Sequence, residues 1–197
     1  MSQTTNTLDN STADNSPVDK AAISPTKLAH FVLRSAHYRE SVQWWNNFLG
    51  ARAQFESEFL TFLTYDEEHH RLAIVNAPNA KTASRDSVGF DHVAFSYASL
   101  EQLVLNYERL KKSEIKPYWC INHGPTTSLY YRDPDQNQAE LQVNNFPTDE
   151  ESSAFFHSDT FRKNPIGVEF DVEVLVKKFH AGTPVEELLK QGSAPAP

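Results

Sequence analysis

Residues 90–95 read FDHVAF, a short apolar run that carries one histidine, His92, at its third position. Residues 28–33 read LAHFVL and carry His30 at the same position, 62 residues earlier in the chain. Short apolar runs that are bounded by turn-forming residues are typical of buried strands. The two runs therefore predict two equivalent buried strands, each of which presents a histidine.

A helix and three strands are predicted after the first of these runs. Residues 38–49 place Val42, Trp45 and Phe48 at helical spacing, and Gly50 supplies a stop. The strand-like runs that follow lie at residues 53–55, 59–65 and 71–75. The first half of the chain thus predicts the order strand, helix and three strands, written βαβββ.

The same order repeats after residue 90. Ser99 is a suitable N-cap, and Gln102 three residues later completes the pattern of a capping box for a helix that runs to about Ser113. Strand-like runs follow at residues 118–121, 128–131 and 139–143. The fourth strands of the two halves align as LAIVN (72–76) against ELQVN (140–144), an offset of 68 residues. Because a repeat of matched elements indicates internal duplication, we predict two βαβββ modules.

The domain boundaries follow from these elements. We expect a disordered arm at residues 1–25, the paired modules at 26–146 (26–80 and 88–146), a C-terminal extension at 147–191 and a frayed tail at 192–197. The arm has few large apolar side chains, so it cannot bury enough surface to offset its ordering entropy. The predicted fold class is α+β, with the two modules forming a cupped mixed sheet and the extension packed on it.

The C-terminal extension carries helix signals and aromatic residues. Asp171 is predicted to cap one short helix and Thr183 a second, with Pro184 at its first position. Three phenylalanines precede a hinge-like turn: Phe155, Phe156 and Phe161, followed by Asn164-Pro165-Ile166-Gly167. Such a segment either closes over a site as a lid or covers the outside of the sheet, and the sequence leaves both alternatives open.

Composition and charge restrict the classes of function. The net charge is −8 and no element carries a basic stripe, so we expect no binding to nucleic acid or to an anionic membrane surface. Cys120 is the only cysteine, which excludes an intrachain disulfide and favours a reducing compartment. The first residues lack the features of a signal peptide, and no apolar run is long enough to span a bilayer. A cytoplasmic location is expected.

His30, His92 and Glu140 are the candidate metal ligands. Two histidines from equivalent strands and a carboxylate from a fourth strand can converge as a 2-His-1-carboxylate triad, which binds Fe(II) and leaves positions open for substrate and dioxygen. A lone strand histidine is more often a satisfied core residue. The repeated position and a carboxylate within an apolar strand favour the ligand role here. The sequence predicts an Fe(II) site within the cupped sheet, with Mn(II) as the alternative.

A longer pattern of residues leads up to Glu140. It runs from Ile121-Asn122-His123 through Leu129-Tyr130 and Asp133-Pro134 to Glu140. The pattern resembles the signature of the type I extradiol dioxygenases of the vicinal-oxygen-chelate superfamily, which ends on a metal-binding glutamate. Gln136 departs from the family, which usually has Gly or Pro in this turn. Asn137 beside it tolerates a positive φ, so we expect the turn to be shifted by one residue.

A second stretch, HHRLAI at residues 69–74, is similar to the segment in which that family carries its acid–base histidine. The resemblance implies His70 as the acid–base, and His123 and Tyr130 as donors around bound substrate and oxygen. The two adjacent histidines could instead be exposed polar side chains that end an acidic turn. The resemblance covers residues 27–146 and looks like the one-domain form of the family, without an additional N-terminal module pair.

The implied activity is the cleavage, with O2, of a catechol-type ring next to its vicinal hydroxyls to give a semialdehyde. This reaction belongs to aromatic hydrocarbon catabolism. In such a site His70 would take a proton from the catechol and supply one when the O–O bond breaks. The implied partners are a small catechol and O2, and paired modules in this superfamily often form a homodimer.

Three rival functions fit parts of the pattern. A glyoxalase-type lyase usually has a carboxylate ligand in the fourth strand of each module, but Leu72 stands where the second module has Glu140. A fosfomycin-resistance-type transferase also uses two histidines and one glutamate, but it would not require His70, His123 and Tyr130. A metal-free protein that sequesters a flat aromatic molecule would leave the candidate ligands unexplained. The sequence therefore favours the dioxygenase.

Overall fold

The structure is a computed structural model that describes residues 23–196 except 83 and 85–87. The arm expected at residues 1–25 lies almost entirely outside the described residues. The first module consists of β1 (Phe31–Ser35), α1 (Tyr38–Leu49), β2 (Arg52–Glu56), β3 (Leu60–Thr64) and β4 (Leu72–Asn76). The second consists of β5 (His92–Tyr97), α2 (Leu100–Lys112), β6 (Trp119–Asn122), β7 (Thr126–Arg132) and β8 (Gln138–Asn144). The predicted βαβββ order is confirmed in both modules.

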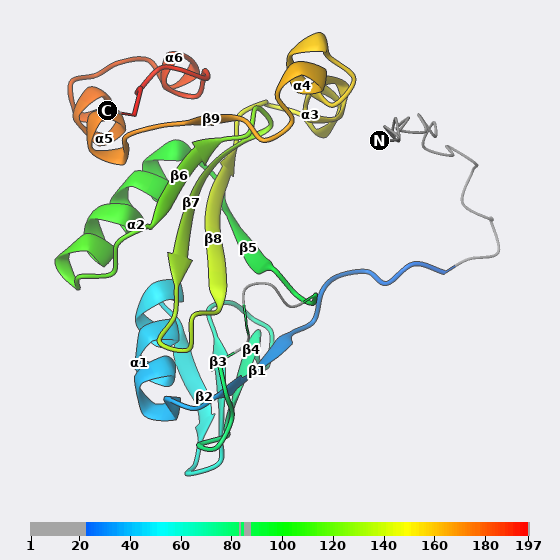
Figure 1. Ribbon diagram of the computed structural model, residues 1–197, viewed down its shortest axis with the longest axis vertical. Coiled ribbons are helices and arrows are strands. Elements are labelled where there is room, and N and C mark those ends of the chain that lie inside the picture. The colour runs from blue at the N-terminus through cyan, green and yellow to red at the C-terminus, as the bar shows by residue number, and fades with distance from the viewer. Residues whose placement is uncertain (1–22, 83, 85–87, 197) are drawn as a thin grey trace, which may run out of the picture.

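Each module forms its own mixed sheet (Figure 1). The strand orders are β1-β4-β3-β2 and β5-β8-β7-β6-β9, where β9 (Val168–Glu169) comes from the C-terminal extension. In each module the first strand pairs with the fourth in parallel, and the other pairs are antiparallel. The predicted α+β class with mixed sheets is confirmed, and the described strands form two sheets, because no ladder joins β1 to β5.

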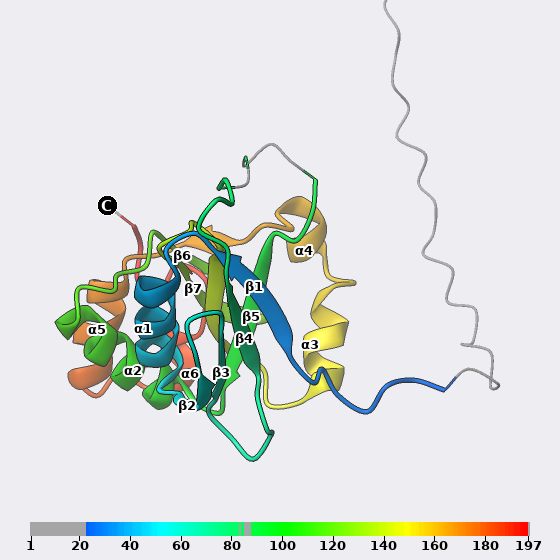
Figure 2. The same cartoon turned by 90° about the horizontal axis from the view of Figure 1, so that it is seen from below.

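The two long helices cover one face of the sheets and build the hydrophobic core. Figure 2 shows α1 and α2 on one side of the strands and α3 (Asp149–Phe155) and α4 (Asp159–Lys163) on the other. Trp45 and Phe48 of α1 are fully buried. Phe95 of β5 lies 6.0 Å from Phe31 and 6.3 Å from Trp45 between ring centroids, so aromatic contacts join the modules. Replacing a fully buried ring such as that of Phe48 by alanine would cost about 3–5 kcal/mol of stability.

The first strand is buried on one face only. Phe31 and Leu33 pack against the core, whereas Val32 is 53% exposed and Leu28, which precedes the strand, is 72% exposed. The fully buried strand expected at residues 28–33 is therefore wrong. Because successive side chains of a strand alternate between faces, the face opposite the helices is left open.

The register of the first and fourth strands corrects the alignment of the two modules. Phe31 pairs with Leu72, and the equivalent Val93 pairs with Ala139. The offset between the fourth strands is therefore 67 rather than the expected 68, and Ala73, not Leu72, occupies the position of Glu140. A shift of one residue moves a side chain to the other face, and Leu72 is indeed buried in the core. The first module still offers no carboxylate there, which counts against a glyoxalase-type ligand set.

The turn between β7 and β8 ties the second module to the first. Asp133 is buried and accepts a hydrogen bond of 2.9 Å from the indole Nε1 of Trp45. Asp135 accepts bonds from the hydroxyls of Ser35 and Ser41, the latter at 2.9 Å. Figure 1 shows this turn reaching α1. The residues of the Asp133-Pro134 motif therefore have a structural role in joining the modules.

The same turn contains a strained residue. Gln136 has a φ of +68°, in the left-handed region, and its side chain is exposed. Asn137 was expected to take this conformation, but its backbone N and side-chain Nδ2 instead donate to Asp133 at 2.8 and 2.9 Å. The expected shift of the turn by one residue is wrong. Glycine adopts this backbone conformation at no steric cost, but the Cβ of Gln136 makes it strained.

Replacing Gln136 by Gly should therefore stabilise the protein. The change removes left-handed strain and no side-chain hydrogen bond, so we expect a gain of about 1 kcal/mol, or about 2–4 °C in melting temperature for a chain of this size. Thermal unfolding followed by circular dichroism measures it. Asn137→Gly is the matched control and should destabilise, because it removes the side-chain bond to Asp133. A stabilising Asn137→Gly and a destabilising Gln136→Gly would contradict the assignment.

The C-terminal extension ends against the second module. Asp171 caps α5 (Val172–His180) as predicted, whereas the N-cap of α6 (Val185–Leu188) is Pro184 rather than Thr183. Within the tail expected to be frayed at 192–197, the described residues 192–196 include Ala194, which is fully buried, and Pro195, which forms a bridge with Phe170. None of the described helices is both long and apolar enough to cross a membrane.

Candidate active site

His92 and Glu140 lie together on the open face of the second sheet. They come from the neighbouring parallel strands β5 and β8, where Glu140 pairs with Ala94. The Nε2 atom of His92 is 3.0 Å from Oε2 of Glu140, and the glutamate side chain is only 5% exposed. Their strand neighbours Val93 and Leu141 pack in the core, so the two functional side chains point away from α1 and α2. A carboxylate this buried requires a partner.

Asp91 orients the ring of His92. Its Oδ2 lies 2.7 Å from Nδ1 of His92. A carboxylate at this nitrogen favours a proton on Nδ1, so Nε2 is the ring nitrogen that would bind a metal. The sequence interpretation missed Asp91, although a carboxylate directly before a candidate ligand was a signal that could have found it.

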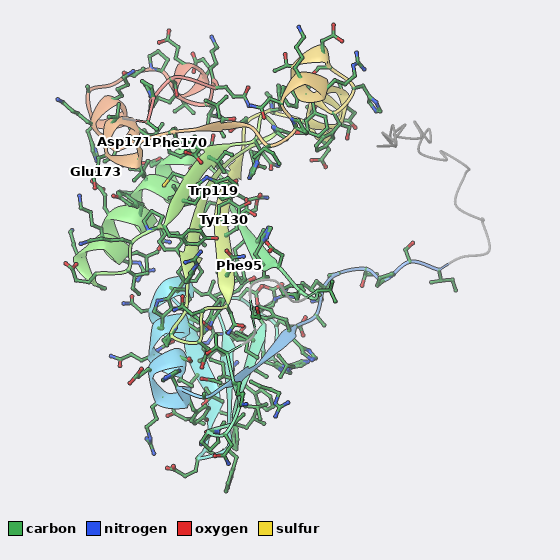
Figure 3. The ribbon with its side chains drawn as sticks, in the orientation of Figure 1. Phe95, Trp119, Tyr130, Phe170, Asp171 and Glu173 are labelled. Carbon is green, nitrogen blue, oxygen red and sulfur yellow. The ribbon has the colours of Figure 1, made fainter. Side chains whose placement is uncertain are left out.

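Tyr130 completes this cluster from β7. It pairs with Glu140 in the antiparallel ladder, and its ring centroid is 5.2 Å from that of His92. Figure 3 shows Tyr130 next to Trp119, whose ring lies 4.8 Å away. Burial and the carboxylate of Glu140 raise the pKa of Tyr130 above its ordinary value. The phenol therefore stays protonated at neutral pH and can act as a hydrogen-bond donor.

His123 contacts the same tyrosine. It follows β6, and its Nε2 lies 3.0 Å from the hydroxyl of Tyr130. Its other ring nitrogen, Nδ1, is 2.5 Å from the backbone oxygen of Ile166 in the C-terminal extension. Of the six residues singled out from the sequence, four therefore form one connected set: His92, Glu140, Tyr130 and His123.

His30 and His70 lie together in the first module. Their ring centroids are 4.3 Å apart, and His70 also packs on Phe62 at 4.5 Å. Burial, followed by the positive charges that His30 and His69 can carry, lowers the pKa of His70. In the part of the chain that the structure describes, no group of three His, Cys, Asp or Glu side chains could hold a metal ion.

The donor set thus fits iron only in part. His92 and Glu140 supply an imidazole nitrogen and a carboxylate oxygen on one face, the donor types that a facial triad uses. Among the described residues, no third His, Cys, Asp or Glu joins them in a group that could hold a metal ion. The assignment of His30 as the third ligand stays a prediction, and so does the acid–base role of His70.

A cavity of about 380 Å³ lies between the modules. Its walls include the core residues Phe31, Trp45 and Val93 and the polar residues Asp91 and Gln138. None of the four connected site residues lines it. The candidate site is therefore separate from this cavity.

The phenylalanines of the extension form a small cluster on the open-face side. The ring of Phe155 lies 5.8 Å from that of Phe146 and 6.1 Å from that of Phe161. The ring of Phe155 also lies directly against Gly124, and a Cβ added at Gly124 would be 2.2 Å from this ring. Because α3 and α4 lie opposite α1 and α2 in Figure 2, the cluster is on the side to which the site residues point. This position is compatible with a lid, which stays a prediction.

The superfamily of the chain is shown by comparison with known proteins. The family model "Glyoxalase/Bleomycin resistance protein/Dioxygenase superfamily" matches residues 27–141, and the chain belongs to this superfamily. Two solved structures share its fold. One is lactoylglutathione lyase from Agrobacterium tumefaciens (TM-score 0.50, 16% identity, 60% of this chain and 94% of that chain). The other is a glyoxylase/bleomycin resistance protein/dioxygenase domain from Frankia sp. EAN1pec (TM-score 0.51, 18% identity, 61% and 99%).

Two curated relatives are much more similar in sequence. Biphenyl-2,3-diol 1,2-dioxygenase 2 of Rhodococcus globerulus is 40% identical over 163 residues, which is 82% of this chain and 86% of the relative. Biphenyl-2,3-diol 1,2-dioxygenase 3 of the same organism is 41% identical over 164 residues, with the same coverage. Both are type I extradiol dioxygenases, so the resemblance to that family is confirmed.

Proposed function

We propose that the protein is an iron(II)-dependent extradiol dioxygenase that cleaves a catechol-type ring of the biphenyl-2,3-diol class with O2. One observation carries the proposal: a chain 40% identical to a biphenyl-2,3-diol 1,2-dioxygenase gathers His92, Glu140, Tyr130 and His123 on one sheet face. The expected product is a semialdehyde, formed by cleavage next to the vicinal hydroxyls.

The residues proposed to hold the metal are His92, Glu140 and His30. Glu140 brings a negative charge and His92 a lone pair that Asp91 keeps available. Iron, when bound, would supply adjacent coordination positions for the two catechol oxygens and for dioxygen. His30, the proposed third ligand, packs beside His70, so the proposed acid–base would be next to a proposed ligand.

Tyr130 of the second module and His70 of the first would act on the substrate. Tyr130 stays protonated and is placed to donate a hydrogen bond to an oxygen on which negative charge develops. His123 is the hydrogen-bond partner of Tyr130 and holds the position of its hydroxyl. His70, with a pKa below the ordinary value for histidine, is neutral at physiological pH and available to take a proton.

Oxygen uptake with a panel of catechols tests the proposed function. The protein is reconstituted anaerobically with Fe(II), and biphenyl-2,3-diol, catechol and a hydroxyl-methylated catechol are supplied with O2. We expect one O2 consumed per ring cleaved with biphenyl-2,3-diol, a coloured semialdehyde product, and no reaction with the methylated control. Stoichiometric iron with no oxygen uptake for any catechol would contradict a dioxygenase. Tight binding of the aromatic compound without iron or turnover would indicate a sequestration protein instead.

A further inference from the structure

The two hydrogen bonds of the His123 ring define its tautomer. Nδ1 lies 2.5 Å from the backbone oxygen of Ile166, and a carbonyl oxygen can only accept. Nδ1 must therefore carry a proton. In the neutral ring Nε2 then has a lone pair, and it accepts the hydrogen of the Tyr130 hydroxyl at 3.0 Å.

The carbonyl is brought to His123 by a tight turn, residues 164–167. Gly167 has a φ of +112°, and a Cβ at this position would lie 2.3 Å from the backbone oxygen of Asn122 and 2.7 Å from Cα of His123. These distances are far below normal contact, so only glycine allows this approach. The backbone of the extension is thus packed directly against the end of β6.

The side chain of Asn164 closes the turn. Its Nδ2 donates to the backbone oxygen of Gly167 at 2.6 Å, and its Oδ1 accepts from the backbone N of Gly167 at 3.1 Å. Directly after the turn, β9 adds to the edge of the second sheet, where Val168 pairs with Asn122. The turn is therefore held from both ends, and the carbonyl of Ile166 has little freedom to move away from the imidazole.

The hydroxyl of Tyr130 has one hydrogen and two acceptors. Nε2 of His123 lies 3.0 Å from it, and the carboxylate of Glu140, its cross-strand neighbour, raises its pKa. When His123 is the Nδ1–H tautomer, the lone pair of its Nε2 can accept the hydroxyl hydrogen of Tyr130. With the opposite tautomer, Nε2–H would donate to the tyrosine oxygen and leave the hydrogen to Glu140. The tautomer of His123 therefore decides toward which neighbour Tyr130 directs its proton.

We propose that the turn at residues 164–167 is a positioning device that fixes His123 as the Nδ1–H tautomer and so orients the hydroxyl of Tyr130. Asn164 and Gly167 are positioning residues, because they act only through the carbonyl of Ile166. The catalytic consequence rests on the proposed function: the hydrogen of Tyr130 is held on Nε2 of His123 in the free site, and it turns to a substrate oxygen when negative charge develops there.

Nuclear magnetic resonance of the metal-free protein, labelled with ¹⁵N in histidine, measures the tautomer directly. The His123 signals are assigned by their loss in His123→Asn. We expect Nδ1–H in the wild type, and a shift toward Nε2–H in Asn164→Ala and Gly167→Ala. Ile166→Ala is the matched control. Its side chain is 61% exposed and its carbonyl is backbone, so the tautomer should be unchanged.

Kinetics of the iron-loaded protein supply the second measurement. In Asn164→Ala we expect kcat to fall about tenfold or more with little change in KM, on the scale of lost outer-shell partners. Ile166→Ala should keep both constants. A wild-type His123 in the Nε2–H form, or a pure Nδ1–H form in Asn164→Ala, would overturn the proposal even if Gly167→Ala failed to fold. A tautomer that shifts as expected in a protein without ring-cleavage activity would uphold the positioning device and reject the proposed function.

Discussion

Replacing Glu140 by Ala is expected to abolish iron binding and ring cleavage together. The carboxylate is 5% exposed and lies 3.0 Å from His92, and it is the one carboxylate in the proposed ligand set. Without it, only neutral imidazoles remain, and these hold Fe(II) weakly. The loss of iron affinity should exceed the roughly 10–100-fold that removal of an outer-shell partner costs. Iron per chain after anaerobic reconstitution and oxygen uptake with biphenyl-2,3-diol measure the two effects.

Gln142 provides the matched control for Glu140. It lies two residues further along β8 on the same face, where its amide donates to Ser96 at 3.3 Å. Gln142→Ala should keep stoichiometric iron and most of the activity. His92→Ala and His30→Ala should lose iron as Glu140→Ala does. Any of these three ligand variants that retained one iron per chain would remove its residue from the proposed ligand set, and His30 is the most informative because it packs beside His70.

The elements of the fold were predictable because local signals and hydrophobic periodicity agree. The helix expected at residues 38–49 is α1, with identical bounds, and Gly50 ends it in the left-handed conformation. Ser99 caps α2 by accepting from the backbone N of Gln102, as predicted. The side chain of Gln102 reaches back to Ala98 rather than to Ser99, so the capping box itself is incomplete. Caps, stops and apolar spacing act within a few residues, which is why one sequence reveals them.

Features that depend on pairing between distant segments were not predictable. The offset of 68 aligned similar letters, but cross-strand pairing places Ala73 at the position of Glu140. The strand β9 has only two residues, and its pairing with β6 comes from the extension. The tail was expected to fray, yet Ala194 is fully buried. Each of these depends on tertiary contacts, which override weak local preferences.

The candidate site also has one part that the sequence could predict and one part that it could not. His92, Tyr130 and Glu140 meet because they lie on adjacent strands of one module, so the strand order brings them together. His30 and His70 lie in the other module, and their distance from this set depends on how the two sheets pack. That packing rests on contacts such as Asp133 with Trp45, which the sequence does not reveal. Whether the two halves of the site combine is therefore a question for iron binding and for variants of both halves.

Replacing His70 by Phe should preserve iron and catechol binding but lower kcat by about 10² or more, the usual scale for a general acid–base. The imidazole packs between His30 at 4.3 Å and Phe62 at 4.5 Å, so a phenyl ring can occupy the same space. Phenylalanine cannot exchange a proton, and the substrate oxygens would have to exchange protons with water instead. Single-turnover experiments separate the effects, because binding of the catechol should keep its rate while ring cleavage slows.

His69→Phe is the control that distinguishes proton transfer from a general effect on this turn. His69 adjoins His70, with their Nδ1 atoms 2.5 Å apart, but its side chain is 71% exposed. We expect less than a few-fold change in kcat, since an exposed neighbour has no direct path to the substrate. Equal losses in both variants would show that the turn matters only for its shape. Loss of iron in His70→Phe alone would make His70 a ligand in place of His30, because the two rings are close enough for either to present a nitrogen at the same point.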